Sequence, residues 1–270
     1  MRYQILVLDL DGTLTNSNKE ITPPTMEALI EIQKMGKKVV LASGRPINGV
    51  APLAEKLHLH EYGGYTLSFN GARITNCSSG ALIYNKTLPL DITQDVFEIA
   101  CSFENLDIVT YDDKTIISGI KPNYYDELES KINTMEIRSV ENFIEYITVP
   151  VNKFLITGEP KIVLEAEEAL KKKFHSYLNI YKSEPYFLEV MPQNIDKAYS
   201  LQKLLSSLGL TADEMICCGD GFNDLSMIQY AGLGVAMENA QDLIKDHADF
   251  ITKSNDEDGV LHVINTFLRD

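Results

Sequence analysis

Acidic side chains lie at two points of the sequence where an apolar run ends. Asp9 and Asp11 directly follow the first apolar run of the chain, and Asp220 and Asp224 follow a later one. Two carboxylates spaced two residues apart can project toward the same side. Crowded carboxylates raise one another's pKa values unless a cation intervenes. Because ligation by oxygen alone suits Mg²⁺ better than zinc, the pattern predicts a magnesium site.

Other positions carry groups that can bind phosphate. Ser43 and Gly44 end another apolar run, where a hydroxyl and exposed backbone N–H groups can cradle phosphate oxygens. Lys197 stands at the start of a predicted helix, with Asp196 as its cap, and Asn223 adds an amide. A metal, a lysine and hydrogen-bond donors are the parts that phosphoryl transfer requires.

The elements between these residues must bring them together. The run 4–8 is continuously apolar, as a strand buried on both faces should be. Further strands and helices are predicted to alternate after it, at 23–35, 38–42, 46–57, 65–69, 196–208, 215–218, 223–230 and 233–236. This alternation predicts an α/β fold with a doubly wound parallel sheet, in which ligands bind at the carboxyl ends of the strands.

The rhythm changes in the middle of the chain. Residues 106–111 and 115–120 are predicted to form a strand pair around Asp112-Asp113, with amphipathic helices near 94–103 and 165–174. We therefore expect a smaller α+β domain inserted into the first one. The predicted division gives residues 1–84 and 187–270 to the catalytic core and residues 85–186 to the inserted domain.

Composition limits the partners of the protein. The 270 residues carry a formal net charge of -15, which repels nucleic acid on average. No apolar run approaches the length needed to span a bilayer, and no signal-peptide pattern is seen, so we expect a cytoplasmic protein. The four cysteines lack CxxC spacing and are interpreted as small apolar residues: Cys77, Cys101, Cys217 and Cys218. The oligomeric state is not predicted.

In the order and spacing of these motifs the chain resembles the haloacid dehalogenase-like phosphatases, and within them the Cof-like group with a large α+β cap. The motifs that carry the resemblance are Asp9 to Thr13, Ser43, Lys197, and Gly219 to Asp224. The insert between Ser43 and Lys197 agrees with the position of such a cap. Ala198 is a departure, because relatives often have Gly after the lysine.

The resemblance implies a role for each matching residue. Asp9 would be the nucleophile that forms an aspartyl phosphate, and Asp11 the acid and base, which requires a pKa closer to neutrality than that of free Asp. Mg²⁺ would be bound by Asp9, the Asp11 backbone carbonyl and Asp220. Asp224 would bind the metal through water or orient its ligands. The phosphoryl group would be held by Leu10, Ser43, Gly44, Lys197 and Asn223.

Several roles remain open at this stage. Arg45 is interpreted as a substrate contact or a structural salt bridge, and Asn70 as a residue that orients the substrate or a simple Asn-Gly turn. In the insert, Lys153 and Tyr186 are candidates to face the leaving group.

The expected substrates are small phosphorylated metabolites, such as sugar phosphates. A dehalogenase is disfavoured by Asp11, and an ATPase pump by the lack of transmembrane runs. A sugar-phosphate mutase and a non-catalytic phosphometabolite sensor remain as alternatives.

Overall fold

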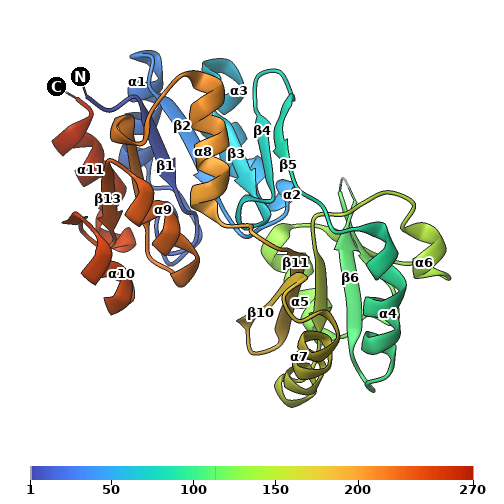
Figure 1. Ribbon diagram of the computed structural model, residues 1–270. Coiled ribbons are helices and arrows are strands. Elements are labelled where there is room, and N and C mark those ends of the chain that lie inside the picture. The colour runs from blue at the N-terminus through green and yellow to red at the C-terminus, as the bar shows by residue number, and fades with distance from the viewer. Residues whose placement is uncertain (1, 113, 270) are drawn as a thin grey trace. The chain divides into compact units, whose positions relative to one another are not determined.

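The computed structural model describes residues 2–112 and 114–269 (Figure 1). The chain divides into two compact units. Unit 1 comprises Met1–Arg45, Val50–Tyr84 and Asp196–Asp270, and unit 2 comprises Pro46–Gly49 and Asn85–Ile195. Each unit has its own sheet and its own buried apolar clusters.

Unit 1 is built around a sheet with strand order β14-β13-β12-β1-β2-β3-β4-β5. Its strands are β1 (Ile5–Leu8), β2 (Lys38–Ala42), β3 (Tyr65–Ser68), β4 (Arg73–Asn76), β5 (Leu82–Asn85), β12 (Met215–Gly219), β13 (Leu233–Ala236) and β14 (Phe250–Ile251). Strands β14 to β3 pair in parallel, whereas β4 pairs antiparallel to β3. This arrangement confirms the α/β class expected from the alternation of strands and helices.

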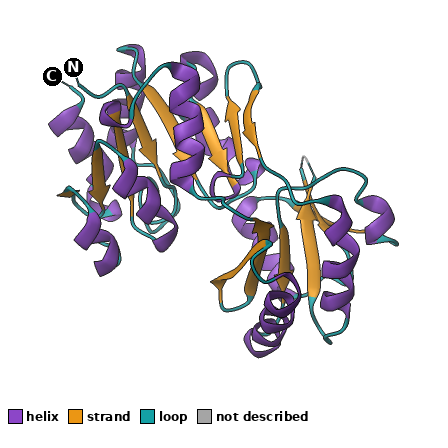
Figure 2. Ribbon diagram, viewed as in Figure 1, coloured by secondary structure: helices purple, strands orange, loops and turns teal. Residues whose placement is uncertain are grey.

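Helices cover both faces of this sheet, as Figure 2 shows by secondary structure. They are α1 (Pro23–Lys34), α2 (Ile47–Lys56), α3 (Leu59–Tyr62), α8 (Lys197–Leu208), α9 (Leu225–Tyr230), α10 (Asp242–His247) and α11 (Gly259–Phe267). Leu6 and Leu8 of β1 pack in the cluster that contains α1 and α11. Ile5 and Val7 pack in the cluster on α8 and α9. A strand buried on both faces must be apolar at every position, which explains the unbroken run at 5–8.

The strand ends bring the motifs of the sequence together. Strands β12, β1 and β2 are adjacent and parallel, so their carboxyl ends share one edge of the sheet. Asp9 follows β1, Ser43 follows β2, and Asp220 follows β12. The ligand site is therefore expected along this edge.

Unit 2 contains a sheet with strand order β10-β11-β9-β6-β7-β8. Its elements are α4 (Thr93–Cys101), β6 (Asp107–Tyr111), β7 (Thr115–Ser118), α5 (Tyr124–Asn133), β8 (Glu136–Ser139), α6 (Phe143–Tyr146), β9 (Phe154–Thr157), α7 (Pro160–Phe174), β10 (Leu178–Glu184) and β11 (Phe187–Pro192). Helices α4 and α7 pack on one face of the sheet. The strand pair β6–β7 is antiparallel, as expected, but Asp113 of its predicted turn lies outside the described residues.

The second boundary of the insert differs from the sequence-based prediction. We expected the core to resume at residue 187, but unit 2 continues to Ile195. The reason is that the apolar residues of β11 pair with β10 and β9 inside the sheet of unit 2. An apolar run does not reveal which of two sheets it joins.

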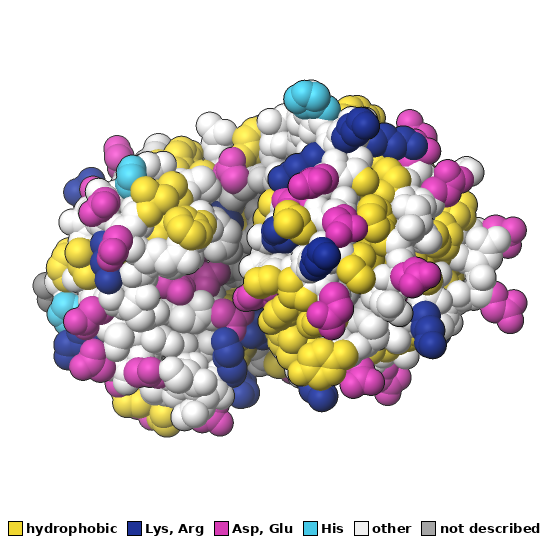
Figure 3. Space-filling view, turned by 90° about the horizontal axis from the view of Figure 1, so that it is seen from below, with side chains coloured by type: hydrophobic (Ala, Val, Ile, Leu, Met, Phe, Trp, Pro, Cys, Tyr) yellow, Lys and Arg dark blue, Asp and Glu magenta, His cyan; other side chains and the backbone are white. Residues whose placement is uncertain are grey.

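Two surface properties bear on the expected partners. Within the residues that the structure describes, none of the helices is both long and apolar enough for a bilayer crossing. On the face drawn in Figure 3, acidic and basic side chains are interspersed, so the net charge of -15 does not gather there into one acidic field.

Candidate active site

A buried lysine joins two aspartates at the carboxyl edge of the unit 1 sheet. Lys197, the first residue of α8, is fully buried, and its Nζ lies 2.6 Å from Asp9 Oδ1 and 2.6 Å from Asp224 Oδ1. It also donates a hydrogen bond to the Ala42 carbonyl at 3.0 Å. Asp196 caps the helix by accepting from the Tyr199 N–H at 2.8 Å. The three groups around Lys197 thus come from β2 and from the segments after β1 and β12.

The charges of this group influence one another strongly. Burial raises the pKa of Asp9 well above its usual value, the charge of Asp224 adds to the effect, and Lys197 opposes it. Burial alone would lower the pKa of Lys197, but the two carboxylates outweigh it and raise that pKa. The lysine is therefore held in its charged form, and the Asp9 carboxylate lies in a place where its own charge is poorly compensated.

Asp220 extends this group of carboxylates. It accepts a hydrogen bond from Thr13 Oγ1 at 2.7 Å, and burial together with the nearby Asp224 raises its pKa to about 6. The loop that follows β1 approaches Asp220 closely at Gly12, whose backbone φ is 85°. A Cβ atom at Gly12 would lie 2.4 Å from Asp220 Oδ2, so glycine is required both by the backbone angle and by the space.

Asp224 organises the loop that carries Asp220. It is fully buried, and its Oδ2 accepts from the backbone N–H groups of Asp220 and Gly221, each at 3.0 Å. Because its other oxygen contacts Lys197, both of its carboxylate oxygens have partners within the protein. This arrangement is closer to the expected orienting role than to direct metal binding.

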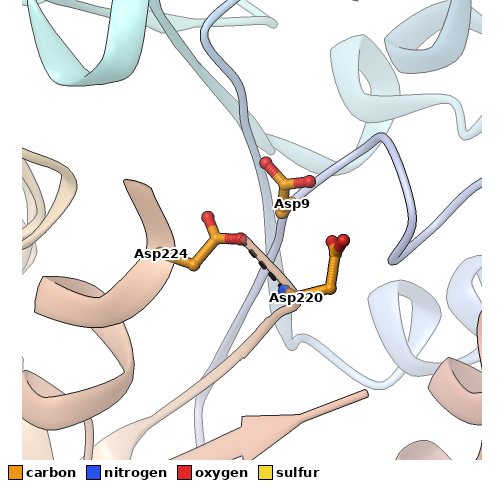
Figure 4. Close-up of side chains that lie close together, drawn as sticks. All are labelled: Asp9, Asp220 and Asp224. Carbon is orange, nitrogen blue, oxygen red and sulfur yellow. Dashed lines mark hydrogen bonds between the residues drawn. The ribbon is translucent and has the colours of Figure 1, made fainter. Parts of the chain in front are cut away.

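The carboxylates fit a divalent metal ion. Figure 4 shows the side chains of Asp9, Asp220 and Asp224 close together, and each offers an oxygen within 4.8 Å of the others. The Lys197 ammonium lies between two of them, Asp9 and Asp224. Burial, together with the neighbouring carboxylates, raises the pKa values of Asp9 and Asp220, so additional positive charge beside them would be favourable. A set of hard oxygen ligands with excess negative charge is what a divalent cation of the Mg²⁺ type requires.

Asp11 does not have the pKa that we expected of an acid and base. Arg45 donates to it at 2.6 Å from Nη2 and 2.8 Å from Nε, and Lys19 donates at 2.8 Å from Nζ. Burial raises the pKa of Asp11, but the hydrogen bonds and charges of Arg45 and Lys19 lower it further than burial raises it. In this arrangement Asp11 is an ionised carboxylate. Arg45 forms a salt bridge with Asp11, and a structural salt bridge was one of the two interpretations of Arg45.

The other residues expected to bind phosphate lie in the segments that follow β1, β2 and β12 in unit 1. Ser43 is buried and its Oγ accepts from the Arg45 N–H at 3.1 Å. Asn223 Nδ2 donates to Asn70 Oδ1 at 3.1 Å. Leu10 is buried, and its carbonyl accepts from the N–H and Oγ1 of Thr15, both at 2.9 Å.

The two candidates in the insert have partners inside unit 2. Lys153 is buried, with its Nζ 2.9 Å from Glu189 Oε2 and 5.1 Å from the centroid of the Tyr111 ring. Lys153 is therefore engaged by Glu189 and Tyr111 within unit 2, and its expected contact with a leaving group stays a prediction. Tyr186 is half-buried and stacks on Tyr125 with ring centroids 5.0 Å apart.

Three contributors to the site were not predicted from the sequence. Thr13 lies inside the first motif, so its hydroxyl could have been assigned from its position there. The Ala42 carbonyl gives no signal in the sequence, because any residue would supply it. Lys19 lies in a loop with a left-handed backbone (φ 62°), and only the folded turn brings its side chain to Asp11.

Comparisons with known proteins agree with this geometry. A family model described as haloacid dehalogenase-like hydrolase matches residues 6–264. The 5-amino-6-(5-phospho-D-ribitylamino)uracil phosphatase YcsE of Bacillus subtilis is 32% identical over 265 residues, which cover 97% of this chain and 94% of the relative.

Solved structures extend the agreement to the fold. A haloacid dehalogenase-like hydrolase from Bacteroides thetaiotaomicron has a TM-score of 0.95 at 46% identity, with coverage of 98% of this chain and 99% of that one. TM0651 from Thermotoga maritima has a TM-score of 0.88 at 30% identity, with coverage of 99% and 98%. The chain therefore belongs to the haloacid dehalogenase-like hydrolase family. Within that family it is a phosphatase.

Proposed function

We propose that this phosphatase depends on Mg²⁺ and hydrolyses small phosphorylated metabolites, such as sugar phosphates, through an aspartyl phosphate on Asp9. The observation that carries the proposal is the contact of Asp9 with Lys197 beside two further carboxylates. A nucleophile for a phosphate dianion must be negatively charged and yet must not repel its target. A buried lysine and a metal ion resolve that conflict.

In the first half of the reaction, an oxygen of Asp9 attacks phosphorus and the bond from phosphorus to the ester oxygen breaks. The leaving oxygen takes the bonding electron pair and receives a proton from Asp11. In the second half, a water oxygen attacks phosphorus while Asp11 accepts a proton from that water. The bond from phosphorus to the Asp9 oxygen breaks, inorganic phosphate leaves, and the Asp9 carboxylate is restored. Asp11 can carry a proton only when its bonds to Arg45 and Lys19 loosen, so substrate binding must rearrange these contacts.

The residues that would hold Mg²⁺ are Asp9, Asp220 and the backbone carbonyl of Asp11, while Asp224 orients the loop of Asp220. When bound, the metal ion supplies positive charge that offsets the charge of the phosphoryl group. Ser43, Gly44 and Asn223 would position the phosphoryl oxygens. We also propose that unit 2 is the cap that selects the leaving group.

The test is a screen of the purified protein against a panel of phosphate esters, with Mg²⁺ and with EDTA. We expect free phosphate to be released with Mg²⁺, no turnover in EDTA, and recovery when Mg²⁺ is added in excess. Full activity in EDTA would contradict the metal requirement. A product phosphorylated at a new position would indicate a mutase, and binding without turnover a sensor.

A further inference from the structure

Residues 69–71 of unit 1 have an unusual backbone conformation. Phe69, Asn70 and Gly71 have φ angles of 53°, 52° and 103° in succession. A left-handed φ is uncommon for residues other than glycine and is an outlier for a bulky residue. For residues other than glycine, such a conformation persists only where the surroundings enforce it.

The segment is held on one side by the phosphate-binding loop after β2. The Asn70 N–H donates to the Ser43 carbonyl at 3.0 Å, and the Phe69 N–H donates to the Arg45 carbonyl at 3.0 Å. Two consecutive N–H groups of the strained segment therefore bond to the loop that contains Ser43 and Gly44.

The other side of the segment is packed against α8, the helix that begins with Lys197. Ser200 Oγ donates to the Gly71 carbonyl at 2.5 Å. A Cβ atom at Gly71 would lie 2.5 Å from Ser200 Oγ and 2.7 Å from the Asp196 carbonyl oxygen, so only glycine fits. The strained segment is thus fixed between the phosphate-binding loop and α8.

This backbone places the Asn70 side chain between two loops of the site. Its Oδ1 accepts from Asn223 Nδ2 at 3.1 Å. It also lies against Gly44, since a Cβ atom there would be 3.1 Å from Asn70 Oδ1 and 3.2 Å from its Nδ2. Asn70 therefore links the loop after β2 to the loop after β12.

We infer that Asn70 is a positioning residue, which fixes the Asn223 amide and the Gly44 backbone at the spacing that a phosphoryl group needs. The inference rests on the proposed function. It also bears on the two interpretations of Asn70, a residue that orients the substrate or a simple Asn-Gly turn: the side chain acts through Asn223 and Gly44 and so does more than complete a turn. A residue that organises phosphoryl-binding groups must affect every phosphate ester equally, because all of them share the phosphoryl group.

The first test is Asn70→Gly, because glycine adopts the left-handed backbone without strain and so removes the side chain alone. We expect kcat/KM to fall about 10-fold, the effect of one misplaced hydrogen-bonding group, by the same factor for acetyl phosphate and for hexose phosphates. The melting temperature should stay near that of the wild type. The matched control is Asn105→Gly in unit 2, where an exposed Asn has the same kind of backbone (φ 62°), and its activity should not change.

The second test is a double-mutant cycle with Asn223→Ala. If Asn70 acts through Asn223, removing Asn70 in the Asn223→Ala background should cost less than about 3-fold, because the shared interaction is already lost. A purely structural role would leave the two effects independent, and their factors would multiply.

Three outcomes would overturn the inference: unchanged kcat/KM in Asn70→Gly, different factors for different leaving groups, or independent effects in the cycle. Failure of the proposed function is recognised separately, because the wild-type protein would then release no phosphate from any ester of the panel.

Discussion

Replacement of Asp9 by Asn separates the chemical role of this carboxylate from its structural one. Asn has nearly the same shape but carries no charge and is a poor nucleophile. The Asp9 side chain is buried and accepts a hydrogen bond from Lys197 Nζ at 2.6 Å. We expect Asp9→Asn to lose at least about 10⁴-fold in kcat, as is found when a nucleophile is removed, while the fold stays intact.

The effect on stability is the balance of two opposite contributions. Loss of the charge-assisted bond to Lys197 costs about 1.5–3 kcal/mol. Removal of the buried charge has the opposite effect, because each unit by which the folded state raises the pKa of an acid subtracts about 1.4 kcal/mol of stability once that acid is ionised. Burial and the charge of Asp224 raise the pKa of Asp9 more than Lys197 lowers it.

The second contribution should therefore prevail in metal-free buffer. Lys197 keeps Asp224 and the Ala42 carbonyl as partners in the variant. The destabilisation from Asp9 develops as pH rises through its folded-state pKa, so the comparison belongs above that range. There we expect the free energy of unfolding in EDTA to be equal to that of the wild type or higher by about 1 kcal/mol.

Two measurements check this reasoning: phosphate release from acetyl phosphate, and urea unfolding in EDTA. The matched control is Asp213→Asn, an exposed residue before the opposite end of β12, which should change neither quantity. Activity above about one-hundredth of wild type would remove Asp9 from the role of nucleophile. A stability loss above about 3 kcal/mol would show that the ion pair, and not the buried charge, dominates.

Three further substitutions test other parts of the molecule. Asp11→Asn should slow hydrolysis of hexose phosphates by about 10²–10⁴-fold and that of acetyl phosphate much less, because only a poor leaving group needs a proton; equal losses would argue against an acid role. Lys153→Met leaves Glu189 buried without its cation and should lower the free energy of unfolding by about 3–5 kcal/mol. The control Lys171→Met breaks a more exposed pair with Glu167 and should lower it by less than about 1 kcal/mol. Similar losses for the two variants in thermal unfolding would contradict this prediction. Burial and the charge of Asp107 raise the pKa of Asp126 from 3.8 to about 7. The free energy of unfolding should therefore fall as pH rises between these values. Asp126→Asn should make that fall smaller, as measured by urea unfolding across the same pH range.

Much of unit 1 could be predicted because its signals are local. A strand buried on both faces must be apolar throughout, and Leu6 and Leu8 pack on the opposite face from Ile5 and Val7. The start of α1 follows from Thr22 and the prolines after it, which supply a cap and a first turn. Parallel strands then bring the residues that follow them to one edge, which is why Asp9, Ser43 and Asp220 could be grouped before their positions were known.

Unit 2 was predicted less well because its signals are shared between alternatives. The apolar residues of β11 fit either sheet, and only pairing with β10 and β9 assigns them to unit 2. Lys153 could have been a surface cation facing a ligand. Its contact with Glu189, 36 residues away in the sequence, is what buries it.

The residue types of the site and their order along the chain were determined by the sequence itself, because chemistry depends on which groups are present. Their pKa values were decided by the tertiary structure. Asp9 and Asp11 are two residues apart and chemically identical, yet burial beside Asp224 raises the pKa of Asp9, while Arg45 and Lys19 lower that of Asp11. A pKa depends on solvent exclusion and on the distances between charges, and both are set only when segments far apart in the chain pack together.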